Sequence, residues 1–201
     1  MPLTLIIPRT LQPVSLAEAK LHLRVDTDAD DALITALIIA AADDAEHLMG
    51  RAVLPQTWQL TLDSFGVSAG ICTSTSEIVL QKPPISAISN VKYLQASDGV
   101  LTTLSPSAYV LATASDYTAR LVPAYGTSWP ATRALPEAVR ITFVTGYADS
   151  ASVPEPIKAW IKLRIGSLYA NREAWTVGIR EALNRNEFVD RLLDRYTALT
   201  F

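Results

Sequence analysis

Apolar residues recur at helical spacing near both ends of the chain, whereas in the middle they alternate with polar residues. Ser15 and Glu18 have the spacing of a capping box, in which each side chain bonds to the other residue's backbone amide. A short helix is therefore predicted to begin after Ser15. The polar run 26–31 is expected to end it.

The clearest helical pattern follows directly. Asp28 or Asp30 is placed to cap the beginning of this helix, and Gly50 is placed to end it. Its apolar positions are Leu33, Ile34, Leu37, Ile38, Ala41, Ala45 and Leu48. The many alanines allow close approach of another helix, from the same subunit or from a neighbour.

From Gln56 the period of the pattern changes from helical to two, because Trp58, Leu60 and Leu62 alternate with polar residues. A β-rich region begins here. Asp98-Gly99 is a hairpin signal between two of its strands. The further strands are expected at 77–81, 89–95, 100–104, 108–112, 117–122 and 138–145.

Helical spacing returns after Pro154 and Pro156, which are tolerated in a first helical turn. The apolar face of this helix comprises Ile157, Trp160, Ile161, Leu168 and Tyr169, and a last helix carries Val189, Leu192, Leu193 and Tyr196. The fold class is therefore expected to be α+β, with helices at both ends enclosing an antiparallel β-rich middle.

The charge is small but uneven. Charged residues are only 18% of the chain and the net charge is -3, which argues against a dedicated nucleic-acid binder. Residues 1–55 carry four Lys/Arg against eight Asp/Glu, whereas residues 151–201 carry eight against six. The acidic beginning and the mildly basic end could pair within one fold or between neighbouring subunits.

The search for a targeting or membrane segment predicts neither. The apolar run before Pro8 has no basic segment ahead of it, so it does not have the form of a secretion signal. The longest strongly apolar stretch, 32–42, is well short of the ~20 residues that span a bilayer. We expect a soluble, cytoplasmic protein without a membrane partner.

The sequence contains no recognisable metal-binding or catalytic motif. The acidic run at Asp26, Asp28 and Asp30 resembles the opening of a calcium loop, but Asp31 and Leu37 stand where that loop needs glycine and glutamate. We therefore expect these aspartates to cap the helix that follows and not to bind calcium. No histidine cluster, phosphate loop or nucleophile elbow is apparent, so we expect no catalytic residue, no metal ligand and no cofactor, and hence no enzyme.

The four tryptophans are expected to be buried as large apolar residues, with one exception. Trp175 follows Asn-Arg-Glu beyond the predicted end of a helix. This position makes Trp175 a candidate anchor in an interface with a partner.

Taken in order, these pieces resemble the head-tail connector (adaptor) proteins of tailed bacteriophages and prophages, in the longer form with a β insert. The matching segments are SLAEAKLHLRVD, DDALITALIIAA, Glu46 with Gly50-Arg51, Trp58 with its strand, Pro83-Pro84 before VKYL, Tyr109, Trp129-Pro130, AVRITFVTGY, Pro154 with Ile157-Lys158, and LYANRE ahead of LLDRY. Their order and spacing, more than any single motif, carry the resemblance.

The resemblance implies a helical bundle built from both chain ends, residues 1–55 and 151–201, with residues 56–150 as the inserted β-rich subdomain. It also implies a structural role in the virion neck. Such subunits form a ring beneath the portal protein, dodecameric in the virion. The ring continues the DNA channel without binding DNA specifically, and it offers a docking platform to the next neck or tail completion protein.

In relatives the C-terminal segment reaches the portal, so the resemblance places residues 191–201 there. The interface residues expected on this basis are Trp175, Arg191, Arg195, Tyr196 and Phe201. The low-charge surface and the Ala-rich helix suit a ring subunit, which needs a different face for each neighbour.

Two other classes of function stay open at this point. A hydrolase could use carboxylates of the β region that converge in space, namely Asp63, Glu77, Asp98, Asp116 and Glu137. A β-rich binding module of the virion surface could use exposed aromatic residues. A cleft lined by two carboxylates would favour the enzyme, and an exposed aromatic platform would favour the binding module.

Overall fold

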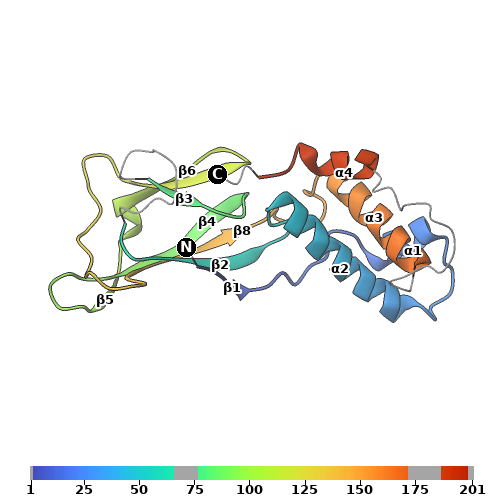
Figure 1. Cartoon of the computed structure of the whole chain (residues 1–201), viewed down its shortest axis with the longest axis horizontal. Helices are drawn as coiled ribbons and strands as arrows, with labels where there is room; N and C mark the ends of the chain where they lie inside the picture. The colour runs from blue at the N-terminus through green and yellow to red at the C-terminus, as the bar shows by residue number, and fades with distance from the viewer. Residues whose placement is uncertain (1, 66–76, 172–186, 199–201) are drawn as a thin grey trace.

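The computed structural model describes residues 2–65, 77–171 and 187–198. It is elongated, with a helical lobe at one end and a β lobe at the other (Figure 1). Each lobe has its own hydrophobic core. The predicted α+β class, with helices from both chain ends packed together and an antiparallel β-rich region between them in sequence, is confirmed.

The helical lobe contains α1 (Leu16–Leu23), α2 (Asp31–Met49), α3 (Glu155–Ala170) and α4 (Glu187–Asp194). Its core joins the two ends of the chain, because Ile34 and Ile38 of α2 are buried together with Ile161 of α3 and Leu193 of α4. Gly50 ends α2 in the left-handed conformation, with φ of 64°, as its position predicts. None of the helices among the described residues is long and apolar enough to cross a membrane.

The predicted capping box at the start of α1 is present. The Glu18 amide donates to the Ser15 hydroxyl at 3.2 Å, and the Ser15 amide donates to the Glu18 carboxylate at 2.8 Å. The acidic run that leads into α2 links the first two helices, because Asp28 and Asp31 both pair with Lys20 of α1. Asp30 occupies the N-cap position of α2 but accepts from the Tyr169 hydroxyl instead of from a backbone amide.

The Ser15→Ala change is expected to lower the free energy of unfolding by about 1 kcal/mol, the usual effect of losing an N-cap. The Ser15 backbone amide and hydroxyl hold the pKa of the Glu18 carboxyl below its ordinary value of 4.5. A lowered pKa stabilises the fold above that ordinary value, and the stabilisation is lost as the pH falls through the folded-state pKa. Titration of Glu18 by NMR should therefore show its pKa rising toward 4.5 in the variant; an unchanged pKa would contradict the capping role.

The β lobe consists of two antiparallel sheets that share one core. The larger sheet has the order β1-β2-β8-β4-β5 and the smaller has the order β3-β7-β6. Their bounds are β1 (Leu3–Ile7), β2 (Gln56–Leu62), β3 (Ile78–Leu80), β4 (Ile85–Leu94), β5 (Leu101–Thr103), β6 (Tyr109–Ser115), β7 (Thr118–Pro123) and β8 (Val139–Thr145), with a 3₁₀ turn at Pro106–Ala108 before β6. Phe143 of β8 and Leu121 of β7 are both fully buried between the sheets.

Each strand expected in the middle of the chain is present, although β4 begins at Ile85, before the expected residue 89. The Asp98-Gly99 hairpin is also present, with Gly99 at φ of 72° and a bond from the Gln95 amide to the Val100 carbonyl. Strand β1 was not predicted. It pairs antiparallel with β2, placing Leu3 beside Leu60, so residues 1–55 contribute a strand as well as helices.

The failure to predict β1 has a physical reason. Its sequence LTLII lacks a sustained period-two alternation, because the strand is largely exposed on both faces and neither face is fully buried in the core. Only its pairing with β2, which is distant in sequence, establishes it as a strand.

Candidate partner interface and the helix–sheet junction

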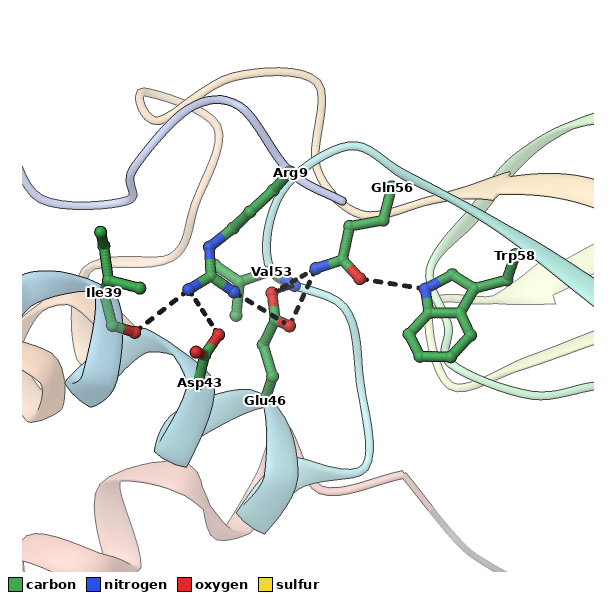
Figure 2. A network of polar contacts seen from close by, with 7 residues as sticks. All are labelled: Arg9, Ile39, Asp43, Glu46, Val53, Gln56 and Trp58. Atoms are coloured by element: carbon green, nitrogen blue, oxygen red, sulfur yellow. Dashed lines mark hydrogen bonds and ion pairs between the residues drawn. The ribbon is translucent and has the colours of Figure 1, made fainter. Parts of the chain in front are cut away.

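The junction between the two lobes is held by a part-buried carboxylate near the end of α2 (Figure 2). Glu46 accepts from the Val53 amide at 3.0 Å and from the Gln56 side-chain amide at 2.7 and 2.8 Å. The carbonyl oxygen of the Gln56 side chain in turn accepts from the Trp58 indole at 3.0 Å. A residue of α2 therefore fixes the first residues of β2.

Arg9, in the link from β1 to α1, extends this network (Figure 2). Its guanidinium pairs with Asp43 at 2.6 Å and with Glu46 at 3.2 Å, and it donates to the Ile39 carbonyl at 3.1 Å. The Arg9 side chain is only 7% exposed, so these contacts are shielded from solvent more than an ordinary surface pair. The network ties β1, α2 and β2 together.

Arg51 forms a second and deeper link immediately after α2. It is 2% exposed, and its guanidinium donates to three backbone carbonyls: Pro83 at 3.4 Å, Tyr196 at 3.2 Å and Asp116 at 2.7 Å. These carbonyls belong to the loop before β4, the segment after α4 and the β6–β7 turn. One side chain thus joins three segments that are far apart in sequence.

Two tyrosine rings complete the surroundings of Arg51. Its guanidinium carbon lies 5.1 Å from the ring centre of Tyr117 and 6.0 Å from that of Tyr147, within the range of cation–π attraction. Burial raises the pKa of the Tyr147 hydroxyl, and the charge of Arg51 partly opposes this rise. The charge of Arg51 is therefore balanced by carbonyl dipoles and aromatic faces.

The segment after α4 is held at this junction through its backbone. The Tyr117 hydroxyl donates to the Arg195 carbonyl at 2.6 Å, and the Ala198 amide donates to the Met49 carbonyl at 2.7 Å. Together with the bond from Arg51 to Tyr196, these contacts fix the backbone of the segment at the junction.

The residues expected at a partner interface are only partly within the described chain. Arg191 and Arg195 are exposed, whereas Tyr196 is half-buried against the core of the helical lobe. Trp175 and Phe201 lie outside the described residues. Arg191 and Arg195 therefore lie on the surface of the C-terminal segment, but no contact described here brings all five residues together.

Sequence reasoning did not assign the roles of Glu46 and Arg51. The sequence does contain one signal for Arg51, which stands between Gly50 and the apolar run Ala52-Val53-Leu54. An arginine that is buried with such neighbours needs hydrogen-bond acceptors for its charged side chain. Its partners are backbone carbonyls of distant segments, which no local pattern marks.

Three of the five carboxylates considered for a hydrolytic site make contacts within the β lobe. Asp63 accepts from the Glu137 amide at 3.0 Å, Glu77 pairs with Arg120 at 3.0 Å, and Asp98 accepts from the Val100 amide at 2.9 Å. Within the described ranges, no three His, Cys, Asp or Glu residues are grouped in a way that could hold a metal ion.

The aromatic residues of the β lobe are mostly covered. Trp129 stacks on Phe65 with ring centres 4.7 Å apart, and both line a depression of about 740 Å³. Trp58 and Trp129 are half-buried, and Trp160 in the helical lobe is 3% exposed. Tyr125 is fully exposed, but one exposed ring is not the aromatic platform that a binding module would present.

Comparison with known proteins agrees with the resemblance read from the sequence. Residues 13–103 match the family model described as phage gp6-like head-tail connector protein. No curated protein sequence matches the chain significantly.

Solved structures match the whole fold. A chain from "Neck of empty GTA particle computed with C6 symmetry" is 20% identical with a TM-score of 0.77, over 100% of this chain and 97% of that chain. A chain from "Virion of native gene transfer agent (GTA) particle" is 19% identical with a TM-score of 0.75, over the same shares of both chains. A third, from a native GTA neck computed with C12 symmetry, is 16% identical with a TM-score of 0.70, over 98% of this chain and 97% of that chain.

At these identities the structural matches establish the shared fold, and the family match adds the sequence relationship. Over residues 13–103, slightly less than half of the chain, the sequence is similar to the phage gp6-like head-tail connector family.

Proposed function

We propose that this chain is a head-tail connector subunit, a structural protein of the virion neck in a phage-like particle. The observation that carries the proposal is the family match over residues 13–103, joined to a fold shared along its full length with chains of GTA necks. The role is structural, and we propose no catalytic step for it.

We further propose that the subunits form a ring, twelve in the virion, which lies beneath the portal protein and continues the DNA channel. Support comes from two similar chains, which are parts of necks computed with C6 and C12 symmetry. The net charge of -3 suits a channel through which DNA slides, since a strongly basic wall would hold the phosphates. The next neck or tail completion protein would dock on the far side of the ring.

We assign the contact with the portal to the C-terminal segment, with Trp175, Arg191, Arg195, Tyr196 and Phe201 as its interface residues. The exposed side chains of Arg191 and Arg195 support this assignment, because they lie on a segment whose backbone is anchored at the junction. In the same proposal, residues 1–55 and 151–201 supply the bundle, apart from strand β1, which joins the sheet, and residues 56–150 supply the projecting subdomain.

Binding to the cognate portal tests this function. Light scattering of the purified chain with and without portal rings should show a complex of defined stoichiometry, and a strain lacking the gene should accumulate heads without attached tails. Failure to bind the portal, together with filled and tailed particles from the deletion strain, would refute the proposal.

A further inference from the structure

The segment after α4, residues 195–198, is bonded through its backbone to side chains that lie outside it. The Arg195 carbonyl accepts from the Tyr117 hydroxyl at 2.6 Å, and the next carbonyl, that of Tyr196, accepts from the Arg51 guanidinium at 3.2 Å. Two successive peptide groups are therefore held in place. The path of the backbone in turn sets the direction in which their side chains leave it.

One of these two donors belongs to the other lobe. Tyr117 lies in the turn between β6 and β7, whereas Leu193 of α4 is buried in the core of the helical lobe. In Figure 1 the segment after α4, drawn in red, runs from the helical lobe toward the end of β6. The β lobe thus holds a segment that follows directly from a helix of the helical lobe.

Arg51 joins the same turn and the same segment from inside. Its guanidinium donates to the Asp116 carbonyl of the turn at 2.7 Å as well as to the Tyr196 carbonyl, and it lies 5.1 Å from the centre of the Tyr117 ring. Because Arg51 is only 2% exposed, water competes little for these bonds. The turn and the segment therefore share one buried cation, which couples their positions.

We propose that the β6–β7 turn positions the segment after α4 for contact with its partner, with Tyr117 and Arg51 as the positioning residues. This inference deepens the proposed function and rests on it, because the partner there is the portal protein. Arg195 is exposed, and Tyr117 holds the backbone carbonyl of this residue. A segment that is already ordered loses less conformational freedom on binding, so Tyr117 strengthens the contact without touching the partner.

Removal of the Tyr117 hydroxyl alone tests this role. Tyr117→Phe keeps the ring beside Arg51 but loses the bond to the Arg195 carbonyl. Binding of the full chain to purified portal rings, measured by isothermal titration calorimetry, should weaken about threefold to tenfold, the range in which one hydrogen bond usually acts. Amide hydrogen exchange of residues 195–198 in the free chain should become faster. A loss of affinity smaller than about twofold would overturn the inference.

The control makes the same chemical change elsewhere on β6. Tyr109 lies at the opposite end of this strand from the turn and pairs with Pro123 of β7. Tyr109→Phe should change the affinity for the portal less than about twofold. Circular dichroism establishes that both variants are folded, and an equal loss of affinity in the two would contradict a specific role of Tyr117.

A double-mutant cycle shows whether Tyr117 acts through the side chain of Arg195. Arg195→Ala keeps the carbonyl that accepts from Tyr117 but removes the side chain assigned to the portal. In this background Tyr117→Phe should weaken portal binding less than about twofold. A purely structural role of Tyr117 predicts the same loss with and without the Arg195 side chain, and that result would overturn the inference.

The outcomes also separate this inference from the proposed function. Portal binding by the unaltered chain, with the same affinity for Tyr117→Phe, would overturn the positioning role alone. Failure of the unaltered chain to bind the portal would overturn both.

Discussion

The Gly146→Ala variant is expected to lose more than about 3 kcal/mol of unfolding free energy, enough to unfold much of the protein. A Cβ atom at this position would lie 2.2 Å from the Leu54 carbonyl oxygen and 2.4 Å from its carbon. These are backbone atoms, so no side-chain rotation relieves the overlap. Gly146 also has φ of 97°, which an L side chain rarely adopts.

The chain offers a matched control for this prediction. Gly126 has φ of 75°, and a Cβ atom there would meet nothing within 4 Å. Gly126→Ala should therefore show only the conformational cost of about 1 kcal/mol. Urea unfolding followed by circular dichroism measures both variants, and equal losses would show that the close approach to Leu54 is unimportant.

The contact between Gly146 and Leu54 lies where the chain passes between the two lobes, so its loss should affect both of them. Gly146 directly follows β8, and its amide donates to the Pro84 carbonyl at 2.8 Å. Leu54 lies in the link from α2 to β2, so two segments that connect the lobes touch at their backbones. This contact fixes the two lobes against each other.

Replacing Arg51 by methionine is expected to have the second large effect, a loss of about 3 kcal/mol in unfolding free energy. Methionine keeps much of the apolar stem but leaves the carbonyls of Pro83, Asp116 and Tyr196 without this donor. Buried acceptors that lose a charged partner are costly. We also expect faster amide hydrogen exchange in the segment after α4, because Arg51 bonds to Tyr196 there.

Arg164→Met is the control, since it makes the same chemical change at the surface. Arg164 pairs with Asp44 at 2.9 Å, and the two side chains are 43% and 46% exposed. Such pairs contribute less than about 1 kcal/mol. If the two variants unfold at the same urea concentration, Arg51 is not the link between lobes that its contacts indicate.

The sequence was sufficient for most elements because their signals are local. The capping box at Ser15 and the glycine at position 50 bound two helices, and alternation from Trp58 onward indicated the strands. Strand β1 was missed because its partner β2 lies some fifty residues away, and an edge strand open on both faces has no alternation.

The candidate interface was harder to predict for a related reason. Tyr117 bonds to the backbone of Arg195, 78 residues away in sequence, and no local pattern marks it. Tyr196 shows the reverse case, because it was expected at an interface and is half-buried against the helical core. The family resemblance indicates what kind of partner to expect. Only the fold shows which side chains are exposed for contact with such a partner.

Electron cryomicroscopy of the particle that contains this chain tests the connector role most directly. We predict a ring of this chain in the neck, between the portal and the tail, with α4 and the segment after it directed toward the portal. A neck reconstruction whose ring is accounted for by other proteins, with this chain absent from the purified particle, would contradict the account.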